Sequence, residues 1–308
     1  MIADFGIFGG DGRSCYLAAE LLRRGHRVAV YSLSQESGAK AVLREAGGLK
    51  TAGSLRELVQ SAPVLAGPVP FSRYIRKEAA EESCGRGSGN SCSDDLTQEE
   101  LLRCLAGGQR LFAGQLPAEF TEKAEAAGVS CVDFLKEEAV LSENAVLTAQ
   151  GCLAEILRAW PGKLAAANVL VLGYGCCGSE IAGMLGSIGA RVTVCVRRVE
   201  SAWKAAQRGL CVCYAEGLAE ELGRQDVIIN TVPARLLGIE LLKKLRRGAL
   251  LVEIASQPGG FSPGEARECG VNAIFCPGLP GKYCPLGAAA AMADCLCNCG
   301  SSQAAGNK

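Results

Sequence analysis

Three glycines between two apolar runs carry the clearest chemical signal in the sequence. Gly173, Gly175 and Gly178 follow the apolar run Val169–Leu172 and precede apolar residues at helical spacing. After a strand, the first glycine permits a tight turn, the second lets backbone approach a pyrophosphate, and the third lets the helix pack closely. The N-terminus of that helix offers free N–H groups and partial positive charge to phosphates. With a second apolar run at 192–196, the pattern predicts a βαβ unit that binds a dinucleotide.

Two arginines stand where the second strand ends. A site for NAD places Asp or Glu there to bond the ribose 2′-hydroxyl. This chain has Arg197 and Arg198 instead, and the first acidic residue after the strand is Glu200. Guanidinium groups suit a 2′-phosphate, which a carboxylate would repel. We therefore expect NADP(H) as the cofactor; the alternative is that both arginines are solvated loop charges.

Loops after other predicted strands are expected to complete the cofactor site, because open parallel sheets bind ligands at the carboxyl ends of their strands. The expected cofactor-binding residues are Gly173, Tyr174, Gly175, Cys176, Cys177, Gly178, Arg197, Arg198, Asn230, Thr231, Val232, Pro233, Ala255, Ser256, Pro277, Gly278 and Leu279.

Composition excludes several classes of protein. The chain of 308 residues has 32 basic and 32 acidic residues, so no net charge favours nucleic acid or anionic membrane. No signal pattern and no apolar run of membrane-spanning length is present, which predicts a cytoplasmic protein. The 17 cysteines are expected to be reduced and to act as small hydrophobes. The run Cys295-x-Cys297-x-Cys299 matches no standard zinc spacing, so we expect no metal.

The alternation of apolar runs and helical patterns predicts an α/β protein of two domains. Residues 1–148 are expected to form a smaller Rossmann or flavodoxin-like domain on the substrate side. Residues 149–285 are expected to form the Rossmann domain that binds NADP. An alanine-rich helix within 286–300 is expected to pack back on the first domain, by analogy with two-domain dehydrogenases.

The predicted elements follow the same alternation. The expected strands are Phe5–Phe8, Val28–Tyr31, 63–66, Gln109–Ala113, Val129–Val132, 169–172, 192–196, Leu210–Tyr214, the run Val227–Pro233, Ala249–Ile254 and Ala273–Phe275. The expected helices include Ser54–Val59, one capped by Thr97 and Glu100, Ala118–Ala127, Asn144–Trp160 and Gly287–Cys297. Loops are expected at Ser83–Asp95 and Pro277–Gly281.

A second glycine turn, Gly9-Gly10-Asp11-Gly12-Arg13, follows the first predicted strand. It lacks the dinucleotide spacing, so we expect no second dinucleotide there. Asp11 and Arg13 could instead face a substrate, where Arg13 would bind a carboxylate as a fork, or they could form a salt-linked loop. Pro70, in a proline-rich strand exit, is expected at the same sheet edge and is included in the substrate site.

The single histidine, His26, precedes a strand of the first domain and is expected to be a surface turn residue. It is far in sequence from the predicted nicotinamide end. This disfavours the dehydrogenases that place a His–carboxylate pair beside the nicotinamide.

Together, several motifs make the chain resemble the A subunit of dipicolinate synthase, an enzyme of endospore-forming bacteria. The matching pieces are Gly9-Gly10-Asp11-x-Arg13, the glycine loop at 173–178, Asn230-Thr231-x-Pro233, Ala255-Ser256-x-Pro258-Gly259-Gly260 and Pro277-Gly278-Leu279-Pro280-Gly281. The resemblance implies NADP-linked conversion of 4-hydroxy-tetrahydrodipicolinate, a small dicarboxylate from a branch of the lysine pathway, to dipicolinate during sporulation. It also implies the flavodoxin-like B subunit of that synthase as a partner, and a place in the mother-cell cytoplasm. A homo-oligomer is expected as well.

Two departures from the family pattern affect the expected catalytic residues. The chain has Gln150 where the family tends to have Glu, and Leu286 where it often has Lys. Lys282 is the nearby candidate to replace that lysine, and Asn144 and Thr148 are expected to add hydrogen bonds to the substrate. The alternatives are another amino-acid, imino-acid or 2-hydroxy-acid dehydrogenase on this scaffold, or a catalytically silent NADP-binding subunit.

Overall fold

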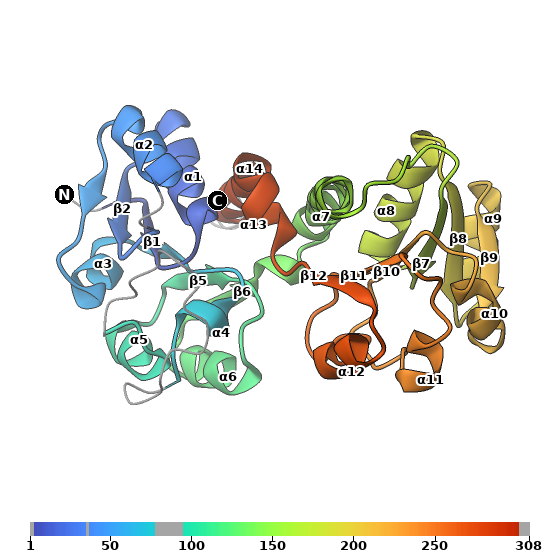
Figure 1. The fold of residues 1–308 in the computed structure, drawn as a ribbon. Helices are drawn as coiled ribbons and strands as arrows, with labels where there is room; N and C mark the ends of the chain where they lie inside the picture. The colour runs from blue at the N-terminus through green and yellow to red at the C-terminus, as the bar shows by residue number, and fades with distance from the viewer. Residues whose placement is uncertain (1–2, 35–36, 78–94, 302–308) are drawn as a thin grey trace. The chain divides into compact units, whose positions relative to one another are not determined.

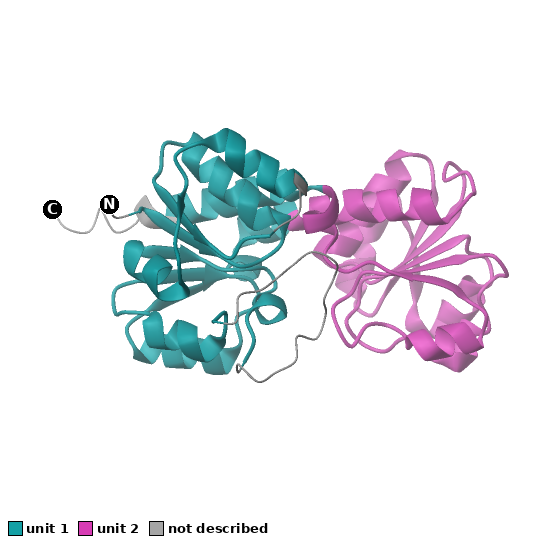
Figure 2. Cartoon of the chain, turned by 60° about the vertical axis from the view of Figure 1, so that its left-hand side comes forward, with its two compact units in different colours: residues 1–143, 284–308 teal, residues 144–283 magenta. Residues whose placement is uncertain are grey.

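Two parallel sheets of six strands organise the chain. The structure, a computed structural model, describes residues 3–34, 37–77 and 95–301. The chain divides into unit 1, residues 1–143 with 284–308, and unit 2, residues 144–283 (Figure 2). The loop expected at Ser83–Asp95 lies outside the described residues, except for Asp95 itself. Within the described part of the chain, no helix is long and apolar enough to cross a membrane.

Unit 1 has the strand order β3-β2-β1-β4-β5-β6, all parallel (Figure 1). Its strands are β1 (Phe5–Phe8), β2 (Val28–Tyr31), β3 (Lys50–Thr51), β4 (Val64–Ala66), β5 (Arg110–Ala113) and β6 (Ser130–Asp133). Its helices are α1 (Gly12–Arg23), α2 (Ser37–Ala46), α3 (Leu55–Ser61), α4 (Phe71–Tyr74), α5 (Gln98–Cys104), α6 (Ala118–Ala126), the 3-10 turn η1 (Phe134–Lys136) and α14 (Pro285–Ser301).

Helices cover both faces of this sheet. Phe5 and Ile7 of β1 pack with residues of α1 and α14, whereas Phe8 packs on the other face with residues of α3, α5 and α6. Helix α14 lies against α1, where Arg24 and Asp294 form an ion pair at 2.7 Å. The C-terminal helix is therefore part of the core of unit 1.

Unit 2 has the corresponding order, β12-β11-β10-β7-β8-β9, again all parallel. Its strands are β7 (Asn168–Leu172), β8 (Arg191–Val196), β9 (Cys211–Tyr214), β10 (Val227–Asn230), β11 (Leu250–Glu253) and β12 (Asn272–Phe275). Its helices are α8 (Cys176–Ser187), α9 (Val199–Gln207), the 3-10 turn η2 (Ala215–Gly217), α10 (Leu218–Leu222), α11 (Ile239–Leu242), α12 (Pro263–Glu268) and α13 (Leu279–Tyr283). Helix α7 (Glu138–Ala159) begins in unit 1 and continues into unit 2.

The apolar run of β7 is continuous because both of its faces are buried. Val169 and Val171 pack beneath α7, α8 and α9, while Leu170 and Leu172 pack beneath α10, α11 and α12. A strand buried on both faces has no polar alternation. This explains why the central strands of unit 2 could be recognised from their sequence.

The predicted two-domain α/β fold is confirmed, and the strand order shows that unit 1, like unit 2, has the Rossmann order rather than the flavodoxin order. Several details of the prediction are wrong. Pro277–Gly281 is not a loop throughout, because α13 begins at Leu279. Helix α7 begins six residues before the predicted Asn144. Helix α2 and the helices from α9 to α12 were not predicted.

The capping motif before α5 forms only in part. The Thr97 side chain accepts a hydrogen bond from the Glu100 N–H at 3.1 Å, as predicted. The Glu100 carboxylate pairs with Arg103 at 2.6 Å, and the Thr97 N–H donates to the backbone of Asp95.

Candidate dinucleotide-binding site

A cavity of about 470 Å³ opens at the carboxyl ends of the strands in unit 2. Three predicted pieces meet in its wall: the glycine loop after β7, the arginines after β8 and the loop after β10. The lining residues are Leu172, Gly173, Tyr174, Gly175, Cys176, Cys177, Gly178, Cys195, Val196, Arg197, Arg198, Ser201, Ala215, Leu218, Thr231, Val232, Pro233, Ala234 and Leu236.

The glycines are required by contacts within this wall. Gly173 has φ +93°, and a Cβ there would lie 2.7 Å from Oγ1 of Thr231. The Thr231 hydroxyl donates to the carbonyl oxygen of Leu172 at 2.8 Å, which ties the loop after β10 to the end of β7. A Cβ on Gly178 would lie 2.4 Å from the carbonyl oxygen of Gly173. The glycine loop therefore has no room for side chains at these two positions.

The corresponding helices of the two units, α1 and α8, differ in the residue that precedes their first turn. Helix α1 is capped by Asp11, whose carboxylate accepts from the Arg13 N–H at 3.0 Å. Helix α8 is preceded by Gly175, which has no side chain to cap it. Only α8 thus combines a free first turn with room for an anion, and an anion at this end is favoured by the helix dipole. The residues fit a dinucleotide pyrophosphate in unit 2.

Arg197 and Arg198 form the rim of the cavity beyond β8. Both line it together with Ser201, in the first turn of α9. The nearby carboxylate of Glu200 pairs with Lys204 at 2.9 Å. Ala215 and Leu218 supply an apolar wall beside this rim. Sequence reasoning missed Ser201, Ala215 and Leu218, because α9 and the turn after β9 were not predicted.

Asn230 does not line the cavity; it lies behind the cavity wall, where it is fully buried. Its Nδ2 donates to the Glu253 carboxylate at 2.8 and 3.0 Å and to the carbonyl of Val232 at 2.9 Å. Glu253, 5% exposed, also accepts from the N–H groups of Ala255 at 2.9 Å and Gly260 at 2.7 Å. This network fixes the loops after β10 and β11, and sequence reasoning missed Glu253. The sequence contains a pattern that could have indicated this contact, because Asn230 and Glu253 each end the apolar run of a central strand, and these strands are neighbours.

Thr148 lies against the glycine loop. Burial raises the pKa of the Cys177 thiol, and the hydroxyl of Thr148 opposes that shift through a hydrogen bond. The same hydroxyl donates to the carbonyl of Asn144, one turn earlier in α7, at 2.7 Å. The structure thus brings Thr148 to the glycine loop, with Asn144 one turn away in α7.

Lys282 lies on α13 and forms an ion pair with Glu155 of α7. This contact raises the pKa of the Lys282 ammonium, so near neutral pH the group is a cation and cannot accept a proton. Beside the pair, α7 and α13 pack closely: a Cβ on Gly151 would lie 2.8 Å from Cβ of Leu279. Leu279 is consequently a core residue of unit 2. Ala255, Ser256, Pro277 and Gly278 likewise lie outside the lining of the cavity.

In unit 1, Arg13 is 6% exposed and is held by its own loop. Its Nη2 donates to the Asp11 carboxylate at 2.7 Å and to the carbonyl oxygen of Val69, next to Pro70. Burial by itself would lower the pKa of the Arg13 guanidinium. The hydrogen bond and the charge of Asp11 outweigh this effect, so the pKa of Arg13 is raised. Asp11, Arg13 and Pro70, the residues expected on the substrate side, therefore lie near one another. The guanidinium of Arg13 is already bound by the Asp11 carboxylate.

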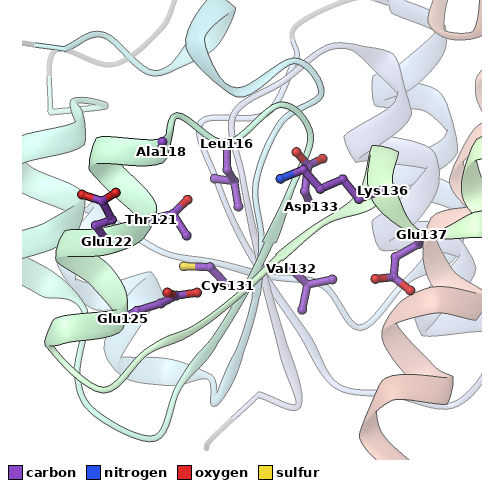
Figure 3. A pocket seen from close by; sticks show the side chains of 10 residues that line it. All are labelled: Leu116, Ala118, Thr121, Glu122, Glu125, Cys131, Val132, Asp133, Lys136 and Glu137. Carbon is purple, nitrogen blue, oxygen red and sulfur yellow. The ribbon is translucent and has the colours of Figure 1, made fainter.

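A second cavity, of about 480 Å³, lies in unit 1 between α6 and the end of β6 (Figure 3). Glu122 and Glu125 line it from α6, and Asp133 and Lys136 from the other side. Asp133 caps the following turn by accepting from the Leu135 N–H at 3.0 Å. No residue of the predicted site lines this cavity.

His26 is half-buried rather than a plain surface residue, with its Nε2 3.5 Å from the sulfur of Cys297.

Two Rossmann-type units, of which one has an uncapped glycine loop, define a protein with the architecture of a two-domain dehydrogenase. Residues 4–135 match the family model for the N-terminal domain of the dipicolinate synthase A subunit. Residues 145–269 match that of the alanine dehydrogenase/PNT C-terminal domain, which agrees with a nicotinamide cofactor. The A subunit of dipicolinate synthase from Bacillus subtilis (strain 168) is 27% identical over 186 residues, 60% of this chain and 63% of that protein.

Solved structures extend the likeness in fold to nearly the whole chain. The A subunit of dipicolinate synthase from Bacillus halodurans has a TM-score of 0.79 at 21% identity and covers 96% of this chain and 97% of its own. The corresponding chain of dipicolinate synthase from Bacillus subtilis has a TM-score of 0.78 at 22% identity, covering 97% and 96%. The resemblance to the A subunit of dipicolinate synthase, predicted from the motifs, is confirmed.

Proposed function

We propose that the protein is an NADP-linked oxidoreductase that converts 4-hydroxy-tetrahydrodipicolinate to dipicolinate. The observation that carries the cofactor assignment is the rim of the cavity, where Arg197, Arg198 and Ser201 stand together with no carboxylate among the lining residues. Two guanidinium groups and a hydroxyl suit a 2′-phosphate, and the ribose of NAD would leave both cations without an anion.

The glycine loop and α8 would hold the pyrophosphate through N–H groups of the first turn. Tyr174 supports an occupant here, because its hydroxyl is buried and has no hydrogen-bond partner among the described residues. When bound, NADP⁺ supplies a hydride acceptor. The substrate loses one water, one hydride and one proton, and its ring becomes aromatic, so the driving force lies largely in the product.

The residues of this chain then have to bind and orient a dianion. Arg13, positioned by Asp11 and the chain beside Pro70, is the proposed ligand of a substrate carboxylate. Lys282 is proposed as a fixed cation, with Asn144 and Thr148 as hydrogen-bonding groups. Because Lys282 is held protonated by Glu155, its proposed role is charge stabilisation and not proton acceptance.

The partner and setting follow from the resemblance. We propose that the chain acts with the flavodoxin-like B subunit of the synthase, as a homo-oligomer, in the mother-cell cytoplasm of a sporulating bacterium. The test mixes the purified protein, with and without that flavodoxin-like partner, with freshly generated intermediate and either NADP⁺ or NAD⁺. Formation of dipicolinate absorbance with NADP⁺ is expected. Tight NADPH binding without turnover under any condition would identify a silent binding subunit, and oxidation of another imino or hydroxy acid would identify a different dehydrogenase.

A further inference from the structure

Two cysteines face each other across neighbouring strands beside the cavity. Cys195 of β8 is in register with Cys213 of β9. Side chains in register on parallel strands leave the sheet on the same side, and both sulfurs join the cluster that contains Leu172 and Leu218. Neighbouring strands lie about 4.8 Å apart, within the span of Cα separations that a disulfide bridges.

Of the two thiols, only Cys195 lines the dinucleotide cavity. Cys213 lies beside it on β9 and is half-buried. A small reagent in the cavity therefore reaches Cys195 before Cys213, its immediate neighbour. Arg197 of the cavity rim follows Cys195 by two residues, so a displacement of Cys195 is passed to the rim through a very short stretch of backbone.

The two thiols also differ in acidity. The hydrogen bond with Cys213 lowers the pKa of Cys195 and outweighs the opposing effects of burial and Glu216. The same contact raises the pKa of Cys213, which burial raises further. Since the thiolate is the reactive form of cysteine, Cys195 is suited to attack an oxidant and Cys213 to resolve the product.

We propose that Cys195 and Cys213 form a redox-active dithiol, and that its oxidation to a disulfide by hydrogen peroxide weakens dinucleotide binding to unit 2. The Cys195 sulfur attacks one peroxide oxygen, the O–O bond breaks, and a sulfenic acid and one water form. The Cys213 sulfur then attacks the sulfenic sulfur, the S–S bond forms, and the hydroxyl leaves as a second water with the Cys213 proton. Two thiols are oxidised and one peroxide is reduced.

The usual Cα separation across a disulfide is about 5.5–6 Å, wider than the spacing of about 4.8 Å between neighbouring strands, so the bond pushes the end of β8 away from β9. Arg197 and Arg198 then leave the positions in which they meet the 2′-phosphate. A bound dinucleotide covers Cys195 and slows its oxidation. The effect on affinity rests on the proposed cofactor site, whereas formation of the disulfide does not.

The test treats the full chain with hydrogen peroxide, alkylates the remaining thiols and maps disulfides by mass spectrometry. A linked Cys195–Cys213 peptide is expected, in lower yield when NADP⁺ is present. NADPH titration of the same samples should show a Kd about tenfold higher after oxidation, equivalent to the loss of one charged hydrogen bond, with recovery after dithiothreitol. Cys213→Ser should keep the unoxidised affinity and lose the response. Cys211→Ser, exposed on the same strand and in register with Thr193, is the matched control and should respond as the wild type does.

Two results would overturn the proposal. One is the absence of the Cys195–Cys213 peptide under conditions that oxidise other thiols. The other is a loss of affinity that persists in Cys213→Ser, which would assign the effect to oxidation of a single thiol, either Cys195 or Cys176 or Cys177 of the glycine loop, and not to the disulfide. If no dinucleotide binds before oxidation, the cofactor proposal fails while the mapping still decides whether the dithiol forms.

Discussion

The carboxylate of Glu155, 2% exposed on α7, binds the ammonium of Lys282 on α13 and the guanidinium of Arg158 at 2.6 Å. It joins two elements far apart in the sequence. This ion pair decides what Lys282 can do: the residue is a fixed positive charge of unit 2.

The pair should make stability depend on pH below about 4.3, the usual pKa of Glu. Burial by itself would raise the pKa of Glu155, but hydrogen bonds from Lys282 and Arg158 outweigh it and lower the pKa to about 2. A carboxyl whose pKa is lower in the folded state stabilises the protein above its unfolded pKa, and this stabilisation is lost as the pH falls towards 2. Glu155→Gln should therefore cost about 2 kcal/mol of unfolding free energy at pH 7 and little at pH 2.5.

Urea unfolding of the two proteins at both pH values measures this difference. Glu200→Gln is the matched control, since it breaks an exposed pair with Lys204 and should change stability by less than about 0.5 kcal/mol. An equal cost for Glu155→Gln at both pH values would show that packing, not charge, accounts for the effect.

The close approach at Gly178 predicts a sharp difference between two glycines of α8. Gly178→Ala places a Cβ against the carbonyl of Gly173 and should cost about 1–3 kcal/mol, as overpacking does, while weakening NADPH binding. Gly183→Ala, at an open and exposed position of the same helix, should instead stabilise by about 0.5–1 kcal/mol. Thermal unfolding and NADPH fluorescence titration provide both readouts. Unchanged NADPH affinity in Gly178→Ala would remove the glycine loop from the cofactor site.

The rim predicts the choice between cofactors. The double variant Arg197→Asp/Arg198→Ser should raise the Kd for NADPH by at least about 100-fold, because two charge-assisted hydrogen bonds are lost, and should leave NADH binding unchanged or improved. Calorimetric titration with each cofactor measures this directly. Arg191→Ser, at the opposite end of β8, tests for a general effect of charge. Retention of NADPH affinity in the double variant would refute the 2′-phosphate assignment.

The buried network behind the cavity should be essential for the stability of unit 2. Asn230→Leu removes the donor that Glu253 shares with the β10 loop and should cost roughly 2–4 kcal/mol, since a buried carboxylate loses a partner. Asn272→Leu, at the exposed start of β12, should change stability by less than about 0.5 kcal/mol. Chemical denaturation compares the two; similar costs for both would mean that Asn230 contributes no more than an ordinary surface amide.

Local sequence was sufficient for much of the fold. The β7 and β10 runs were recognisable because strands buried on both faces leave uninterrupted apolar stretches. The glycine loop was recognisable because the tight turn and the close approach at Gly178 impose residue types at fixed spacing. The short helix α13 was missed, since Pro280 and Gly281 within it resemble loop residues.

The candidate site was less predictable wherever its contacts are distant in the chain. Lys282 and Glu155 are separated by 127 positions, and no local pattern signals their pairing. Asn230 was assigned to the cofactor because it ends a strand, yet its side chain is engaged by Glu253 of the next strand. Residue type indicated that these groups matter, but only the tertiary arrangement shows which of them face the cavity.

The difference between Asp11 and Gly175 has a thermal consequence. Helix α1 is capped by the side chain of Asp11, so the thermal stability of its first turn does not depend on a bound anion. Helix α8 is preceded by glycine, and an anion that binds there adds its binding free energy to the folding of unit 2. At a cofactor concentration 100 times Kd, that gain is about 2.7 kcal/mol. The melting temperature of unit 2 should then rise with the concentration of cofactor. The thermal stability of unit 2 would thereby report how much dinucleotide is present.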